Sequence, residues 1–125
     1  MAIFNFKKFV RSFSYAIRGF KSVLREQNFR VHTISALSVI VIIILLRLET
    51  WETVALLMMI TLVLVLEIIN SIFERIVDIL EPRVHPYAKT IKDMMASAVL
   101  IASLGAFLVG FLILWPYFKN IMYHF

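Results

Sequence analysis

The order of apolar and charged residues divides the chain into one amphipathic segment followed by three long apolar segments. Within residues 1–30, apolar side chains recur at steps of three and four, the period of one helical face, and Lys and Arg take the remaining sides. A basic helix with large aromatics on one face is typical of a helix lying in the headgroup plane of a membrane. The alternative is a surface helix packed on the rest of the protein. The apolar positions are Phe6, Phe9, Val10, Phe13, Ile17, Phe20 and Leu24.

The three apolar segments are long enough to predict membrane spans. Residues 31–46 contain no charged residue, residues 53–73 contain only Glu67, and residues 94–118 contain none. The shortest run makes about 24 Å of helix at ~1.5 Å per residue, which suffices when the flanking arginines extend toward the headgroups. Pro116 is expected to close the last helix. We therefore predict an all-α integral membrane protein, one domain over 1–125, with an interfacial helix over 1–30 and transmembrane helices over 31–48, 51–79 and 93–116.

Composition supports a membrane protein and narrows its chemistry. Apolar residues make up 62% of the 125 residues, against roughly 45–50% in soluble domains. The formal charge of +5 is compatible with nucleic acid, but the apolar content makes a membrane the better partner, and we expect no nucleic acid. The absence of cysteine excludes disulfides and thiol chemistry.

Basic residues are distributed unevenly among the segments outside the predicted spans. Residues 1–30 hold seven Lys and Arg and residues 74–93 hold four, whereas residues 47–53 and the C-terminal tail hold one each. Positive residues concentrate on the cytoplasmic side of a membrane protein. We expect a multi-pass protein of the inner (plasma) membrane whose N-terminus and 74–93 segment face the cytoplasm.

A stripe of polar residues occupies the end of the second apolar segment. Asn70, Glu74 and Asp78 follow Glu67 at +3, +7 and +11, so all four share one helical face. A carboxylate within a membrane span is a functional hypothesis by default. Each residue also has a structural alternative: Glu67 in a buried ion pair, Asn70 in an interhelical hydrogen bond, Glu74 paired with Arg75 or Lys92, and Asp78 solvated at a helix end.

Further polar residues occur on the same predicted side of the membrane. Lys92 and Asp93 stand before the third span, where a lysine can reach a phosphate and an aspartate can cap the helix. Glu26 is the sole acid in the first 48 residues and pairs with a basic residue or binds a metal. His32 is more often a buried hydrogen-bonding residue than a catalyst. No phosphate-binding GxxxxGK[ST] motif and no HExxH or GxSxG motif occurs.

Small residues form a second stripe, on the third span. Ala98, Ala102, Ala106 and Gly110 recur every four residues and allow close contact between helices. The stripe by itself fits packing within one subunit as well as packing between subunits.

These polar residues resemble those of the prokaryotic diacylglycerol kinase family, which includes the undecaprenol kinases. The resemblance covers about residues 10 to 115 and departs from the common pattern at Ile72-Phe73, where smaller residues are usual. The stretches that carry it are Glu67-Ile-Ile-Asn70-Ser-Ile-Phe-Glu74-Arg-Ile-Val-Asp78, His85-Pro86-Tyr-Ala88-Lys, Lys92-Asp93, and Glu26-Gln-Asn28-Phe-Arg30-Val-His32.

The resemblance implies a homotrimer that transfers the γ-phosphate of ATP to a lipid alcohol at the cytoplasmic interface. Glu67 is then the general base near the lipid hydroxyl, and Glu26 and Glu74 hold Mg²⁺ with the ATP phosphates. The residues implied to order the nucleotide are Asn70, Asp78, His85, Lys92 and Asp93. These roles agree with physical chemistry, because phosphoryl transfer needs alignment and charge neutralisation, and Mg²⁺ prefers one or two carboxylates plus phosphate oxygens and water.

The expected activity is that of a lipid kinase with undecaprenol as acceptor, since the Glu-x-Asn-x-x-x-His and His-Pro-x-Ala-Lys stretches resemble that branch more closely. The alternative within the class is diacylglycerol. Two alternatives lie outside it: a small proton-coupled transporter that uses Glu67, and a non-catalytic membrane subunit whose polar stripe binds a partner. Glu26, Lys92 and Asp93 at one face favour the kinase over the transporter.

Overall fold

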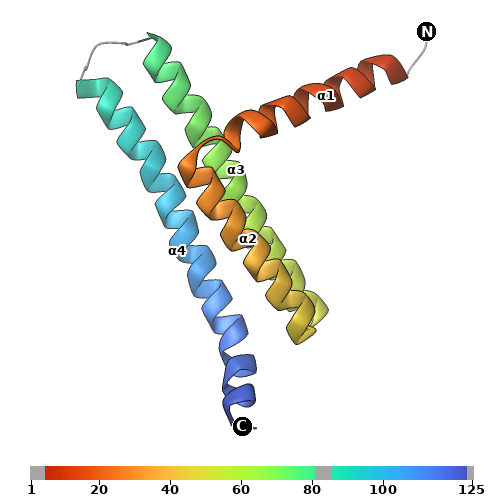
Figure 1. Cartoon of the computed structure of the whole chain (residues 1–125). Helices are drawn as coiled ribbons and strands as arrows, with labels where there is room; N and C mark the ends of the chain where they lie inside the picture. Colours follow the sequence, from red (N-terminus) through yellow and green to blue (C-terminus); the bar gives the residue numbers. More distant parts are fainter. Residues whose placement is uncertain (1–4, 81–85, 124–125) are drawn as a thin grey trace.

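Four helices account for the part of the chain that the computed structural model describes, residues 5–80 and 86–123. They are α1 (Phe6–Val23), α2 (Gln27–Leu46), α3 (Thr50–Leu80) and α4 (Pro86–Tyr123). Figure 1 shows α2, α3 and α4 side by side, with α1 projecting sideways from the end where α2 begins. The central helix is α3, which contacts both α2 and α4.

Three of these helices, α2, α3 and α4, are long and apolar enough to cross a membrane. At ~1.5 Å per residue, α3 and α4 measure about 46 and 57 Å, well beyond the roughly 30 Å of a hydrocarbon core. Both therefore extend past the apolar layer. The expected all-helical membrane protein is confirmed at this level.

The N-terminal segment differs from the single helix expected over residues 1–30. The Asn5 side chain caps α1 by accepting a hydrogen bond from the Lys8 amide at 3.1 Å, and α1 ends at Val23. A turn follows, in which the Glu26 amide donates to the Val23 carbonyl at 2.9 Å, and α2 begins at Gln27 rather than at residue 31.

Packing explains why the chain turns at this point. Phe29 is fully buried, and its ring meets that of Phe20 edge to face with 5.7 Å between centroids. Val23 is buried as well. A continuous helix keeps residues 23 and 29 on its own surface, whereas the turn lets both bury apolar area against the bundle. As a result, Glu26 stands at the N-cap of α2 instead of at the end of α1.

The last helix is longer than the 93–116 segment expected for it. Pro116 lies inside α4, which continues to Tyr123. A proline removes one backbone hydrogen bond and bends a helix without necessarily ending it. Beyond the proline, the Tyr117 hydroxyl donates a hydrogen bond to Glu52 at the start of α3, and this contact holds the last turns of α4 against the bundle.

The protein interior is thin and the outside of the bundle is apolar. The eight buried apolar residues among those described are Val23, Phe29, Ala36, Leu56, Val63, Val77, Val99 and Ile113. Most large apolar side chains on α2, α3 and α4 are exposed. Such a surface requires lipid or another polypeptide around it.

Candidate active site

The polar stripe of α3 passes from the protein interior to its surface. Glu67 and Asn70 are buried, with 3% and 5% of their surface exposed. Glu74, one turn further, is half-buried, and Asp78 is exposed. The buried part of the stripe lies opposite the beginning of α2, because the turn at residues 24–26 leads the chain back across this face of α3.

A cavity of about 250 Å³ lies at this junction of α2 and α3. Its walls include three carboxylates, Glu26 from the N-cap of α2 and Glu67 and Glu74 from α3. The remaining lining residues are Gln27, Asn28 and Asn70. Three acids around so small a volume repel one another, so the cavity favours a cation.

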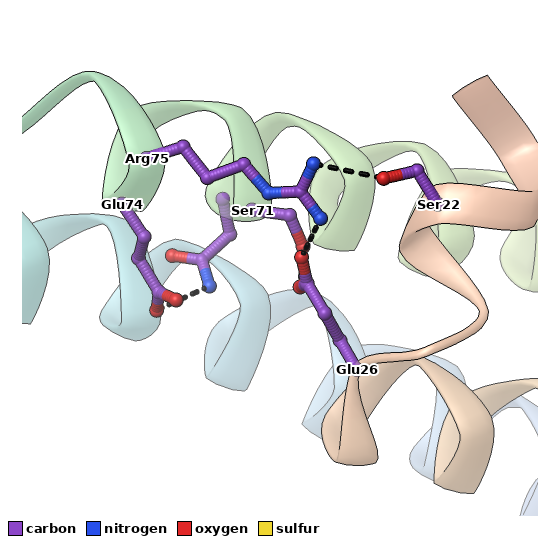
Figure 2. Close-up of polar contacts among 6 residues, drawn as sticks. Ser22, Glu26, Ser71, Glu74 and Arg75 are labelled. Carbon is purple, nitrogen blue, oxygen red and sulfur yellow. Dashed lines mark hydrogen bonds and ion pairs between the residues drawn. The ribbon is translucent and has the colours of Figure 1, made fainter. Parts of the chain in front are cut away.

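Glu26 is held by two side chains from α3 (Figure 2). Ser71 donates a hydrogen bond to one carboxylate oxygen, and Arg75 donates to the other at 2.7 Å. The second guanidinium nitrogen of Arg75 donates to the Ser22 hydroxyl, in the last turn of α1, at 2.9 Å. One arginine therefore connects α3 to the end of α1 and to the start of α2.

Asn70 contributes both a donor and a free acceptor to the site. Its amide nitrogen donates to Glu74 at 3.0 Å, which orients that carboxylate one turn away. Its amide oxygen is buried, and no polar group in the described part of the chain hydrogen-bonds to it. A buried acceptor without a protein partner beside a cavity fits a bound ligand or water that supplies the missing donor.

Glu67 is the most deeply buried carboxylate in the described ranges. The charged or ionisable groups close enough to affect it are His32, Glu74 and Glu26. His32 also lines a second, larger cavity in the apolar part of the bundle.

The cavity suits Mg²⁺ bound jointly by protein and substrate. No group of three or more His, Asp and Glu in residues 5–80 and 86–123 is arranged to hold a metal ion alone. Mg²⁺ takes one or two protein carboxylates and completes its shell with phosphate oxygens and water. Glu26 and Glu74 are two carboxylates from different helices on one small cavity, so the donor set fits.

The remaining expected site residues lie outside this cavity. Lys92 on α4 forms an ion pair with Asp78 on α3 and thereby links the two helices. Asp93 is exposed on α4. His85 lies outside the described residues. The cavity thus brings together Glu26, Glu67, Asn70 and Glu74, and the Asp78–Lys92 pair stands further along α3.

The partners of Glu74 and Arg75 also differ from those that the sequence suggests as structural alternatives. Glu74 contacts Asn70 rather than Arg75 or Lys92, and Arg75 contacts Glu26 across the α1–α2 turn. Sequence reasoning missed Ser71 as a partner of Glu26, although it lies one residue after Asn70. The sequence did contain a signal for this contact. A spacing of four residues places three polar side chains of α3 on one helical face, namely Glu67, Ser71 and Arg75.

Three helices of membrane length and a small cavity lined by carboxylates define a membrane protein with a candidate site for a charged ligand. The sequence model of prokaryotic diacylglycerol kinase matches residues 14–114. The chain belongs to the prokaryotic diacylglycerol kinase family. The resemblance noted in the sequence is therefore confirmed, and so is the expected class of lipid phosphotransferase.

Three relatives illustrate the range of names in the family. A diacylglycerol kinase of Synechocystis is 37% identical over 113 residues, 89% of this chain and 65% of that protein, so the chain spans just under two thirds of its length. An undecaprenol kinase of Bacillus subtilis is 33% identical over 87% of this chain and 89% of its own. A diacylglycerol kinase of Escherichia coli strain K12 is 30% identical over 91% of this chain and 94% of its own.

Proposed function

We propose that the protein transfers the γ-phosphate of ATP, in the presence of Mg²⁺, to the hydroxyl of undecaprenol at the cytoplasmic face of the inner membrane. The observation that carries this proposal is the single small cavity that collects Glu26, Glu67, Asn70 and Glu74 at one end of the bundle. Phosphoryl transfer needs aligned reactants and neutralised charge, and the cavity offers acids for a metal beside a buried base.

Glu67 acts as the general base. The lipid hydroxyl gives its proton to the Glu67 carboxylate while its oxygen forms a bond to the γ-phosphorus, and the bond from that phosphorus to the leaving ADP oxygen breaks. Burial supports this role, because a site closed to water keeps water from taking the phosphoryl group in place of the lipid hydroxyl. The position of Glu67 deepest in the stripe also matches an acceptor that arrives from the membrane.

Glu26 and Glu74 hold the divalent cation, which neutralises charge on the phosphates when bound. Their origins on different helices mean that the site depends on the turn at residues 24–26. Asn70 orients Glu74 and offers its free amide oxygen, and Lys92 contributes positive charge for phosphate. We place Asp78, His85 and Asp93 with Asn70 and Lys92 in the nucleotide site.

The acceptor lies in the larger cavity, of about 660 Å³, between α2, α3 and α4. Its lining is mostly apolar, with Leu56, Val63 and Phe107 among its walls, and His32 is one of its few polar lining residues. A polyprenol has one hydroxyl and an otherwise hydrocarbon chain, which suits such walls. Diacylglycerol carries two ester groups and is the second candidate, because two of the three relatives described carry its name.

Assembly and membrane position complete the proposal. A homotrimer with sites shared between subunits is what the family resemblance implies, and the exposed apolar faces of α2, α3 and α4 are compatible with contacts to lipid and to other subunits. The small-residue stripe faces α3 in part, because a Cβ atom added at Gly110 would lie 3.9 Å from the Leu56 side chain. The exposed Phe6, Phe9 and Phe13 on α1 support a helix in the headgroup plane at the cytoplasmic surface.

Direct competition between the two acceptors tests the proposal. Purified protein in mixed micelles receives γ-labelled ATP, Mg²⁺ and equal amounts of undecaprenol and diacylglycerol, and labelled lipids are separated and counted. We expect label chiefly in undecaprenyl phosphate. Label chiefly in phosphatidic acid moves the protein to the diacylglycerol branch, and label in neither lipid overturns the proposed transfer.

A further inference from the structure

Arg75 is the charged group at the site that has no place in the mechanism above. Its guanidinium reaches away from the neighbouring Glu74 and contacts Glu26 on the far side of the turn (Figure 2). One nitrogen lies 2.7 Å from a Glu26 carboxylate oxygen, and the other lies 2.9 Å from the Ser22 hydroxyl. The arginine side chain is 52% exposed and that of Glu26 is 29% exposed.

Both oxygens of Glu26 already have a donor. Ser71 donates to Oε2 and Arg75 to Oε1. Each carboxylate oxygen has two lone pairs, so a divalent cation that binds Glu26 either shares an oxygen with one of these donors or displaces it. Ser71 has a short, buried side chain fixed on α3, whereas Arg75 has a long, half-exposed one, so Oε1 is the oxygen that exchanges more easily. A guanidinium and a metal ion on one carboxylate are both cations and repel each other, so each lowers the affinity of Glu26 for the other.

We propose that Arg75 is a positioning residue that holds Glu26 before metal arrives and competes with the divalent cation for Oε1 of this carboxylate. This inference rests on the assignment of Glu26 as a metal ligand in the proposed function. Arg75 then stabilises the crowded acids of the metal-free cavity and lowers the apparent affinity for the cation.

The competing explanation is that Arg75 merely ties α1 to α3. The two explanations predict opposite signs. Removal of a competitor strengthens metal binding, whereas loss of a structural tie loosens the α1–α2 turn, disperses the ligands and weakens metal binding. A direct measurement of metal affinity therefore separates them without reference to turnover.

The experiment titrates the full-length protein in micelles with Mn²⁺ and measures free Mn²⁺ by electron paramagnetic resonance. We expect Arg75→Gln to lower the Mn²⁺ dissociation constant about 3- to 30-fold, the range for loss of a partly exposed charge-assisted contact. Arg75→Lys keeps the charge and should stay within about threefold of the wild type. Arg25→Gln is the matched control, because it removes an exposed charge next to Glu26 in the chain, and solvent screening limits its effect to about twofold.

Two further variants keep the inference open to refutation. Ser22→Ala removes the second hydrogen-bond partner of the guanidinium without altering a proposed ligand. It should lower the Mn²⁺ dissociation constant about twofold. This variant tests the competition if Arg75→Gln fails to fold. Glu26→Gln should weaken Mn²⁺ binding, and adding Arg75→Gln to it should bring no gain, because the two cations then have no shared carboxylate.

The outcomes distinguish this inference from the proposed function. Unchanged or weaker Mn²⁺ binding in Arg75→Gln, with weakened binding in Glu26→Gln, overturns the competition and leaves Glu26 as a ligand. Unchanged binding in Glu26→Gln overturns both the competition and the ligand assignment. Phosphate transfer to lipid by the wild type is measured separately, and its absence overturns the proposed function whatever the metal titration shows.

Discussion

The two ends of the bundle each bury a carboxylate, and they use it differently. At the end where α2 begins, Glu67 is 3% exposed and shares a cavity with Glu26 and Glu74. At the opposite end, Glu52 is 8% exposed and accepts hydrogen bonds from the Glu49 amide at 3.0 Å and from the Tyr117 hydroxyl. Glu52 is satisfied by the protein itself.

The helix terminus accounts for this difference. Glu52 lies in the first turn of α3, where free backbone amides and the positive end of the helix dipole stabilise a negative charge. Glu67 lies in the middle of the same helix, where all backbone amides are already used, and its nearest acids repel it. Burial of an acid therefore does not by itself indicate function. Burial beside a cavity that other acids also line does indicate function.

The largest expected difference between Glu67 and Glu52 is in phosphate transfer, and it is tested by neutralising each acid in turn. Glu67→Gln removes the proposed base and should reduce phosphate transfer by about 10²- to 10⁴-fold, the usual contribution of general base catalysis. Nucleotide affinity and subunit assembly should remain, because Gln keeps the size of the side chain. Glu52→Gln, the matched control, should retain transfer within a few-fold. Near-normal transfer by Glu67→Gln refutes the base assignment.

A second variant pair tests which end binds the cation. Glu74→Gln should raise the Mg²⁺ concentration for half-maximal transfer roughly 10- to 100-fold, because it removes one of two proposed ligands. Glu49→Gln removes an acid at the other end and should leave that concentration unchanged. Equal Mg²⁺ requirements in the two variants count against the ligand role of Glu74.

The stability of the protein should depend more on Glu52 than on Glu67, the reverse of the order expected for phosphate transfer. Glu52→Ala deletes the acceptor of two hydrogen bonds at the start of α3 and should lower the free energy of unfolding by about 1–3 kcal/mol. The measurement is unfolding of the purified protein in mixed micelles with increasing denaturing detergent. Glu67→Ala, which removes an acid repelled by its neighbours, should be less destabilising. A larger loss in Glu67→Ala shows that Glu67 has a structural role.

The smallest expected effect concerns the end of α4. Tyr117→Phe removes one of the two donors to Glu52 and leaves the Glu49 amide in place, so we expect a smaller loss of stability than for Glu52→Ala, with transfer unchanged. The same detergent titration measures it. A loss as large as that of Glu52→Ala means that Tyr117, rather than the helix terminus, satisfies the carboxylate.

The sequence predicted the features that depend on local periodicity. Three apolar helices follow from run lengths, and the shared face of Glu67, Asn70 and Glu74 follows from their spacing. The resemblance implied that Glu26 meets this face, and the structure brings it there although 41 residues separate it from Glu67.

The features that depend on packing between helices were not predictable from the sequence. The helix break after Val23 arises from burial of Phe29, and no Gly or Pro marks it. The last turns of α4, past Pro116, include Tyr117, which contacts Glu52 on α3. The choice of Glu26 rather than Glu74 as the partner of Arg75 depends on where the turn places α2. Each of these is a tertiary contact that overrides a local preference.

The most direct test of the account asks which end of the bundle binds the metal nucleotide. The chain contains no cysteine, so single spin labels can be attached at Arg25→Cys beside the cavity and at Thr50→Cys at the opposite end. Distances from bound Mn²⁺–ATP to each label are then measured by pulsed electron paramagnetic resonance. Residues 50 and 74 lie about 36 Å apart along α3 at ~1.5 Å per residue. We predict that Mn²⁺ lies much closer to the label at position 25 than to the label at position 50. A distance to position 50 that is equal to or shorter than the distance to position 25 contradicts this assignment.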